Sequence, residues 1–176
     1  EPLADPPEVV TQALRRLPVD LEMRCAASDV QLDSDTVSGT LNLNGASHLE
    51  ALSLPVLVSA DRFVVETSDD LCAVSAPKLE TVGDNLFVQG NPALSDLTLP
   101  ALTAVGSSLS VTDNDGLTGV SLPLLTIVGR TLALSNNPEL TTLSLPELTQ
   151  SGGEGLNDSF AVENDDSLQD FSFPSL

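Results

Sequence analysis

Few side chains in this sequence could carry out catalysis. There is one histidine, His48, so a Ser–His–Asp triad could form only around it. His48 falls in a predicted turn, and no motif brings a nucleophile toward it. One histidine and two cysteines do not complete the four ligands of a zinc site, and there is no Trp or Tyr to hold a sugar ring. We therefore expect a protein that is not an enzyme and has no cofactor.

The acidic turns are the only candidate metal-binding sites that the sequence suggests. Carboxylate oxygens at turns suit calcium, and the sequence Asp-x-Asp-Gly at 113–116 resembles part of a calcium loop. The distal Glu of an EF-hand is absent, and solvated turns would use the same residues. A calcium-dependent surface module is thus an alternative, with weak candidate ligands at Asp113, Asp115, Asp165 and Asp166.

An internal repeat of about 23 residues positions all of these turns. The consensus unit reads L-P-x-L-x-x-V-G-x-x-L-x-V-x-x-N-x-x-L-x-x-L-x. Pro returns in every unit and Gly in every unit except the one that begins at Pro55, which excludes long helices. The prolines that mark the units are Pro55, Pro77, Pro100, Pro123, Pro146 and Pro174.

Alternating apolar residues in each unit predict short strands with one side facing inward. The inward pairs of the first strand are Leu41/Leu43, Phe63/Val65, Leu86/Val88, Leu109/Val111, Leu132/Leu134 and Phe160/Val162. Such strands are stable only when stacked on the next coil, about 4.8 Å away. The pattern predicts an all-β fold: a right-handed, single-stranded parallel β-helix of about six coils over residues 36–176. Residues 1–35 would form a capping segment with a short helix over residues 7–17.

Two turn positions recur in register along the repeat. A glycine follows the Val of each corner at Gly83, Gly106 and Gly129, and we expect it to supply a positive φ. An asparagine column runs through Asn91, Asn114 and Asn137 and continues to Asp165. Its side chains are expected to bond the backbone or to stack as a ladder between coils.

The outward residues of the first strand form the candidate binding patch: Asn42, Val64, Phe87 and Ser110. Because Leu86 and Val88 point inward, Phe87 should point outward beside Val64 of the neighbouring coil. An exposed Phe–Val pair is unusual on a polar solenoid and predicts a protein-binding face. Alternatively, the N-terminal segment covers the pair, or single exposed hydrophobes have no function.

The charge balance limits the partners. With 26 acidic and 6 basic side chains the net charge is −20, which repels nucleic acids and anionic membrane surfaces. Basic partners and cations remain open, and the same charge could serve only solubility. No apolar run approaches about 20 residues, so we expect membrane contact only through an anchor outside this chain.

The repeat phrase Leu-x-x-Leu-x-Leu-Pro-x-Leu-x-x-Val-Gly-x-x-Leu-x-Val-x-x-Asn resembles the leucine-rich receptor L-domain repeat of insulin-type and epidermal-growth-factor-type receptors. It is also similar to the L-domain-like repeats of fungal GPI-anchored and bacterial cell-surface proteins. The resemblance covers roughly residues 36–176. It implies an extracellular or cell-surface protein with a non-catalytic role in recognition or adhesion.

Two cysteines, Cys25 and Cys72, are the remaining reactive groups. In a secreted chain an even count suggests a disulfide, whereas in a cytosolic chain both would be small buried hydrophobes. We predict a Cys25–Cys72 bond that ties the cap to the second coil.

The function that we expect is presentation of a sheet face to a protein partner. The alternatives are a structural cell-envelope repeat that associates with itself and the calcium module named above.

Overall fold

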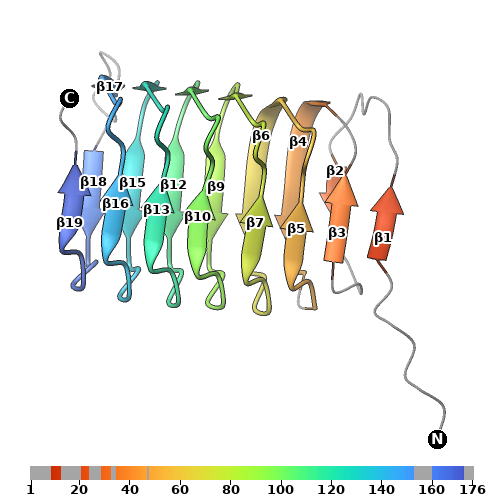
Figure 1. The fold of residues 1–176 in the computed structure, drawn as a ribbon, viewed down its shortest axis with the longest axis horizontal. Coiled ribbons are helices and arrows are strands. Elements are labelled where there is room, and N and C mark those ends of the chain that lie inside the picture. The colour runs from red at the N-terminus through yellow and green to blue at the C-terminus, as the bar shows by residue number, and fades with distance from the viewer. Residues whose placement is uncertain are drawn as a thin grey trace, which may run out of the picture.

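The computed structural model describes residues 9–12, 21–23, 29–32, 35–46, 48–152 and 160–172. Every regular element in these ranges is a β-strand, and every strand pairing between them is parallel. The strands stack into two sheets that form the walls of a β-solenoid (Figure 1). The all-β solenoid predicted from the repeat is confirmed.

The first sheet has eight strands, one from each coil, in the order of the chain. Its strands are β1 (Val9–Gln12), β3 (Asp29–Leu32), β5 (Ala51–Ser53), β7 (Ala73–Ser75), β10 (Asp96–Thr98), β13 (Gly119–Ser121), β16 (Thr142–Ser144) and β19 (Asp170–Ser172). From β5 onward these are the strands that precede the repeat prolines.

The second sheet has eleven strands and bends around one edge of the solenoid. Its main wall consists of β2 (Leu21–Met23), β4 (Thr36–Asn44), β6 (Ser59–Glu66), β9 (Leu86–Gln89), β12 (Leu109–Thr112), β15 (Leu132–Ser135) and β18 (Phe160–Glu163). The edge consists of β8 (Thr81–Val82), β11 (Ala104–Val105), β14 (Ile127–Val128) and β17 (Gln150–Ser151). The long strand β6 joins the two parts because it pairs with both β8 and β9.

The coil is right-handed, as predicted. In Figure 1 the strands of the eight-stranded sheet rise in front, the chain crosses at the top to the main wall behind, and successive coils advance from right to left. Right-handed crossover between parallel strands is the rule for L-amino acids because strand twist favours it.

The predicted N-terminal helix is wrong where the structure describes it. Residues 9–12 form strand β1, which pairs with β3 in register from Val9 opposite Asp29. Two valines and a threonine in succession favour a strand, and the neighbouring edge supplies hydrogen bonds that an isolated helical turn lacks. The rest of segment 7–17 lies outside the described residues. The two parallel sheets of the solenoid therefore extend into residues 1–35.

The core is a set of aliphatic columns that run along the solenoid axis. The inward pairs from Leu41 to Leu134 are at most 1% exposed, as the alternation predicts. The last pair is the exception: Phe160 is 42% exposed and Val162 is only partly buried. Both lie in β18, the outermost strand of its sheet, so a stacked coil covers them from one side only in the described part of the chain.

The glycine column after the corner valine has a different cause from the predicted one. Gly83, Gly106 and Gly129 are not among the residues with positive φ. Glycine is needed because adjacent coils touch there: a Cβ on Gly106 would lie 2.0 Å from the carbonyl oxygen of Gly83, and one on Gly129 would lie 2.2 Å from that of Gly106. The constraint is a close approach of two backbones, not a turn conformation.

Substituting these glycines tests the close approach. We expect Gly106→Ala to lower the free energy of unfolding by about 3 kcal/mol or more, since only a backbone shift can relieve the overlap. Gly83→Ala is the matched control. Its Cβ would have ordinary contacts of 3.6 Å with Asp61, so we expect a change within about 1 kcal/mol. Urea denaturation measures both, and equal losses in the two variants would contradict the explanation.

Candidate binding surface

The outer face of the main wall is almost free of charge at its centre. The side chains that point outward from β9, β12 and β15 are Phe87, Gln89, Ser110, Thr112, Ala133 and Ser135. All six are partly exposed and none is ionisable. Gln89 Nε2 donates a hydrogen bond to Ser110 Oγ at 2.8 Å, which fixes both side chains on adjacent coils. On a chain with a net charge of −20, this face is a distinct neutral surface.

Of the predicted patch, Phe87 and Ser110 lie on this neutral surface. Val64 was predicted to be exposed, and it is buried. Val64 retains only 7% of its accessible surface. It is paired with Asn42 on one side and with Phe87 on the other. Asn42 is partly exposed, but its Oδ1 atom is buried without a hydrogen-bond partner. Phe87 is therefore the large apolar side chain that this surface presents, and Val64 lies next to it on the neighbouring strand β6.

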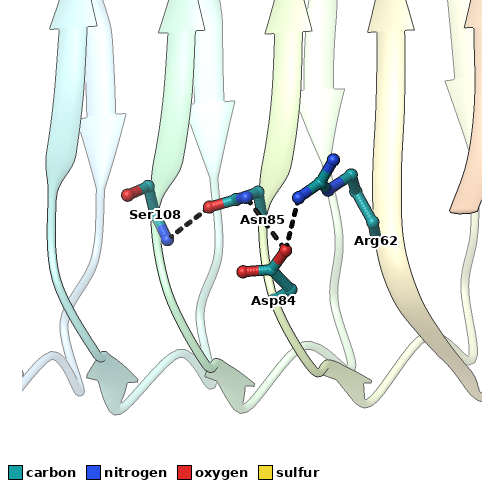
Figure 2. A network of polar contacts seen from close by, with 4 residues as sticks. All are labelled: Arg62, Asp84, Asn85 and Ser108. Atoms are coloured by element: carbon teal, nitrogen blue, oxygen red, sulfur yellow. Dashed lines mark hydrogen bonds and ion pairs between the residues drawn. The ribbon is translucent and has the colours of Figure 1, made fainter.

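A polar network that begins at residues 84 and 85, just before β9, ties three coils together (Figure 2). Arg62 Nη2 donates to Asp84 Oδ2 at 2.6 Å, and Asn85 Nδ2 donates to the same oxygen at 3.1 Å. Asn85 Oδ1 in turn accepts the backbone N–H of Ser108 at 3.1 Å. The Arg62 and Asp84 side chains are 43% and 46% exposed, so their ion pair adds little stability. Its effect is to orient the two side chains at the border of the neutral surface.

The predicted asparagine ladder is present and buried. Asn91, Asn114 and Asn137 have no accessible surface. The Oδ1 atoms of Asn114 and Asn137 each accept two hydrogen bonds from the preceding coil; for Asn114 these come from the backbone N–H and the Nδ2 of Asn91, at 3.1 and 3.2 Å. Asn91 Oδ1 accepts the backbone N–H of Ser68 at 3.2 Å. Each Nδ2 also donates to a backbone carbonyl of the preceding coil, as Asn114 does to Val88 at 3.0 Å. The column is a structural element of the solenoid.

Asp165 ends this ladder in the described chain with a carboxylate in place of an amide. Its Oδ1 accepts from the backbone N–H of Asn137 at 2.7 Å and from Asn137 Nδ2 at 3.2 Å. Its Oδ2 is buried and has no partner, because a carboxylate cannot donate as the amides of the other coils do. Burial raises the pKa of Asp165, opposed by the two bonds from Asn137 and assisted by the nearby charge of Asp166.

The calcium candidates are not brought together as a ligand set. Among the described residues no group of three or more His, Cys, Asp or Glu side chains could hold a metal ion. Asp113 and Asp115 are exposed, and Asp113 Oδ1 accepts from Asn136 Nδ2 at 2.8 Å. Asp165 Oδ1 is occupied by the ladder, and Asp166 is exposed.

The sequence analysis considered Asp113 as a calcium ligand and missed its role as a turn residue with a left-handed backbone conformation. It has a φ of 57° and belongs to a column of left-handed residues, one per coil: Gly45, Thr67, Gly90, Asp113, Asn136 and Asn164. Gly, Asn and Asp tolerate this conformation better than other residues, so their recurrence one position before the ladder column was the available signal. The turn geometry thus accounts for part of the acidic clustering.

The other reactive side chains do not form a site in the described structure. His48 is exposed in a turn, with Nδ1 3.7 Å from Asp70 Oδ2. Cys72 is an exposed free thiol whose Sγ lies 3.2 Å from the carbonyl oxygen of Glu50 on the neighbouring coil. The predicted Cys25–Cys72 disulfide is therefore not formed in this structure; Cys25 lies outside the described residues.

Comparisons with family models, with curated proteins and with solved structures find no match to this chain. The resemblance to L-domain repeats stays a prediction from the repeat phrase. Within the described ranges there is also no helix long and apolar enough to cross a membrane.

Asp165→Asn tests the end of the ladder. An asparagine could donate from Nδ2 to the Leu134 carbonyl, which is in register with the acceptor of Asn137, Val111. Because its folded pKa is raised, Asp165 favours folding when protonated, and this contribution is lost as pH rises through that pKa. We expect the variant to match the wild type near pH 3 and to be about 1 kcal/mol more stable at pH 7.

Urea denaturation at both pH values measures this difference. Asp170→Asn is the control because it removes the same charge from an exposed position on the same coil. An equal gain from Asp170→Asn would show that general charge repulsion, and not the ladder, is responsible.

Proposed function

We propose that this chain is a non-catalytic recognition module of the cell surface or extracellular space, which binds a protein partner through the neutral surface around Phe87. The observation that supports it is the absence of ionisable side chains from the outer faces of β9, β12 and β15 in a chain of net charge −20. Interface centres are typically depleted of charge and enriched in aromatic residues.

The geometry of the surface suits recognition by a preformed partner. Consecutive strands hold their outward side chains at a fixed spacing of about 4.8 Å, so little conformational entropy is lost on binding. Phe87 provides one aromatic anchor, and the Gln89–Ser110 pair provides polar groups that are already oriented. The acidic residues around this surface would then favour a partner whose rim is basic.

A change at Phe87 tests this surface. Small protein domains selected from a naive display library against the chain should bind mainly here, because library binders favour rigid apolar sites. Phe87→Asp should weaken most of them by about tenfold or more, through loss of the anchor and burial of a charge. Thr98→Asp is the control: it adds the same charge to an exposed position on β10, in the other sheet.

Thermal denaturation curves first establish that both variants are folded. The affinities of the folded variants are then measured by biolayer interferometry. Binders that are equally sensitive to both changes, or to neither, would contradict the assignment of this face.

A further inference from the structure

Two large hydrophobic side chains are exposed close together on the narrow edge of the solenoid. Leu124 is 49% exposed and Ile127 is 41% exposed. Ile127 lies in β14 and Leu124 in the turn that leads into it, on the edge where β8, β11, β14 and β17 stack (Figure 1). Elsewhere in the described chain only Phe160 has comparable exposure for a large apolar side chain. The edge therefore has an apolar centre that is separate from the neutral surface around Phe87.

Both side chains belong to columns with the same order along the axis. The column of Ile127 is Thr81, Ala104, Ile127 and Gln150, paired in that register by the edge strands. The column of Leu124, one residue per coil at a spacing of 23, is Lys78, Ala101, Leu124 and Glu147. In each column the large side chain lies next to an alanine, and polar residues lie at both ends.

Each column is complementary to the same column read in the opposite direction, as in a second copy that runs antiparallel to the first. A second copy is generated by a 180° rotation about an axis that lies in the plane of the contact, perpendicular to the solenoid axis and midway between the coils of Ala104 and Ile127. This copy faces the first across the edge and runs antiparallel to it. Leu124 of each copy then faces Ala101 of the other, and Ile127 faces Ala104. A large side chain thus covers a small one at four places. The arrangement is an isologous contact, the commonest kind in homodimers.

The charges agree with the same arrangement. It places Lys78, the only lysine in the chain, opposite Glu147. Neither has an ion-pair partner within the described part of the chain. In the column between the two apolar ones Glu80 meets Thr149, so no like charges are opposed in these columns. Two molecules of net charge −20 repel each other, and few relative positions avoid opposing their acidic groups.

We propose that the chain forms a two-fold symmetric homodimer through this edge, centred on Leu124 and Ile127. Few residues of each copy take part in this contact, so we expect it to bury less than the roughly 1,200 Å² of a stable interface and the dimer to be weak and reversible. It leaves the neutral surface of each copy uncovered, and a dimer would therefore present two such surfaces and gain avidity for a repeated partner. The proposal does not depend on the function assigned to that surface.

Sedimentation velocity of the full chain tests the dimer, from about 10 μM to about 1 mM protein, with about 0.3 M salt to screen the net charge. The expected result is a monomer–dimer equilibrium with no larger species, because two-fold contacts close. Leu124→Glu should lower the association constant by about tenfold or more. Thr98→Glu adds the same charge on the other sheet and should change it by less than about twofold.

Reversal of the pair of charges separates this geometry from general repulsion. Glu147→Lys reduces the net negative charge, so repulsion alone predicts stronger association, whereas the proposed pairing opposes two lysines and predicts weaker association. Combining it with Lys78→Glu should restore the wild-type constant. A wild-type chain that stays monomeric at the highest concentration, a series of larger oligomers, or a stronger dimer from Glu147→Lys would each overturn the proposal.

Discussion

The stability of this fold depends on the contact between one coil and the next. A strand of three or four residues has no partner within its own coil, so its backbone groups are satisfied only by the coils on either side. The same contact buries the leucine columns and closes the asparagine ladder, in which each amide bonds to the preceding coil. Threonines add to it along two columns, as when Thr126 Oγ1 donates to the Thr103 carbonyl at 2.9 Å. Stability is thus distributed over many equivalent interfaces.

This contact also explains the exceptions along the repeat. Gly106 and Gly129 lie against the backbone of the preceding coil, at Gly83 and Gly106, and a side chain at either position has no space. Where stacking is one-sided, the columns change character: Phe160 is exposed in β18, and Asp165 has an oxygen that nothing bonds. A residue's environment therefore follows from its column and also from its position along the axis.

The outer surface is less constrained, and its differences can serve recognition. Inward positions must be aliphatic, whereas outward positions need only fit beside their neighbours. Against a net charge of −20, the neutral surface around Phe87 and the apolar edge around Leu124 stand out for that reason. They lie on different parts of the solenoid, so the two proposed contacts would not compete for the same residues.

The sequence by itself determined the repeat, the inward columns and the asparagine ladder, because a period of 23 residues and strict alternation allow few other solutions. It also identified Phe87 as an outward residue. The tertiary structure alone decided what depends on contacts between coils. Residues 9–12 became a strand because the edge of β3 offered hydrogen bonds. Val64 became buried because Phe87 and Asn42 flank it, and glycine at positions 106 and 129 is required by the neighbouring backbone and not by its own φ. Such effects depend on distances between residues about 23 positions apart, which local sequence patterns do not contain.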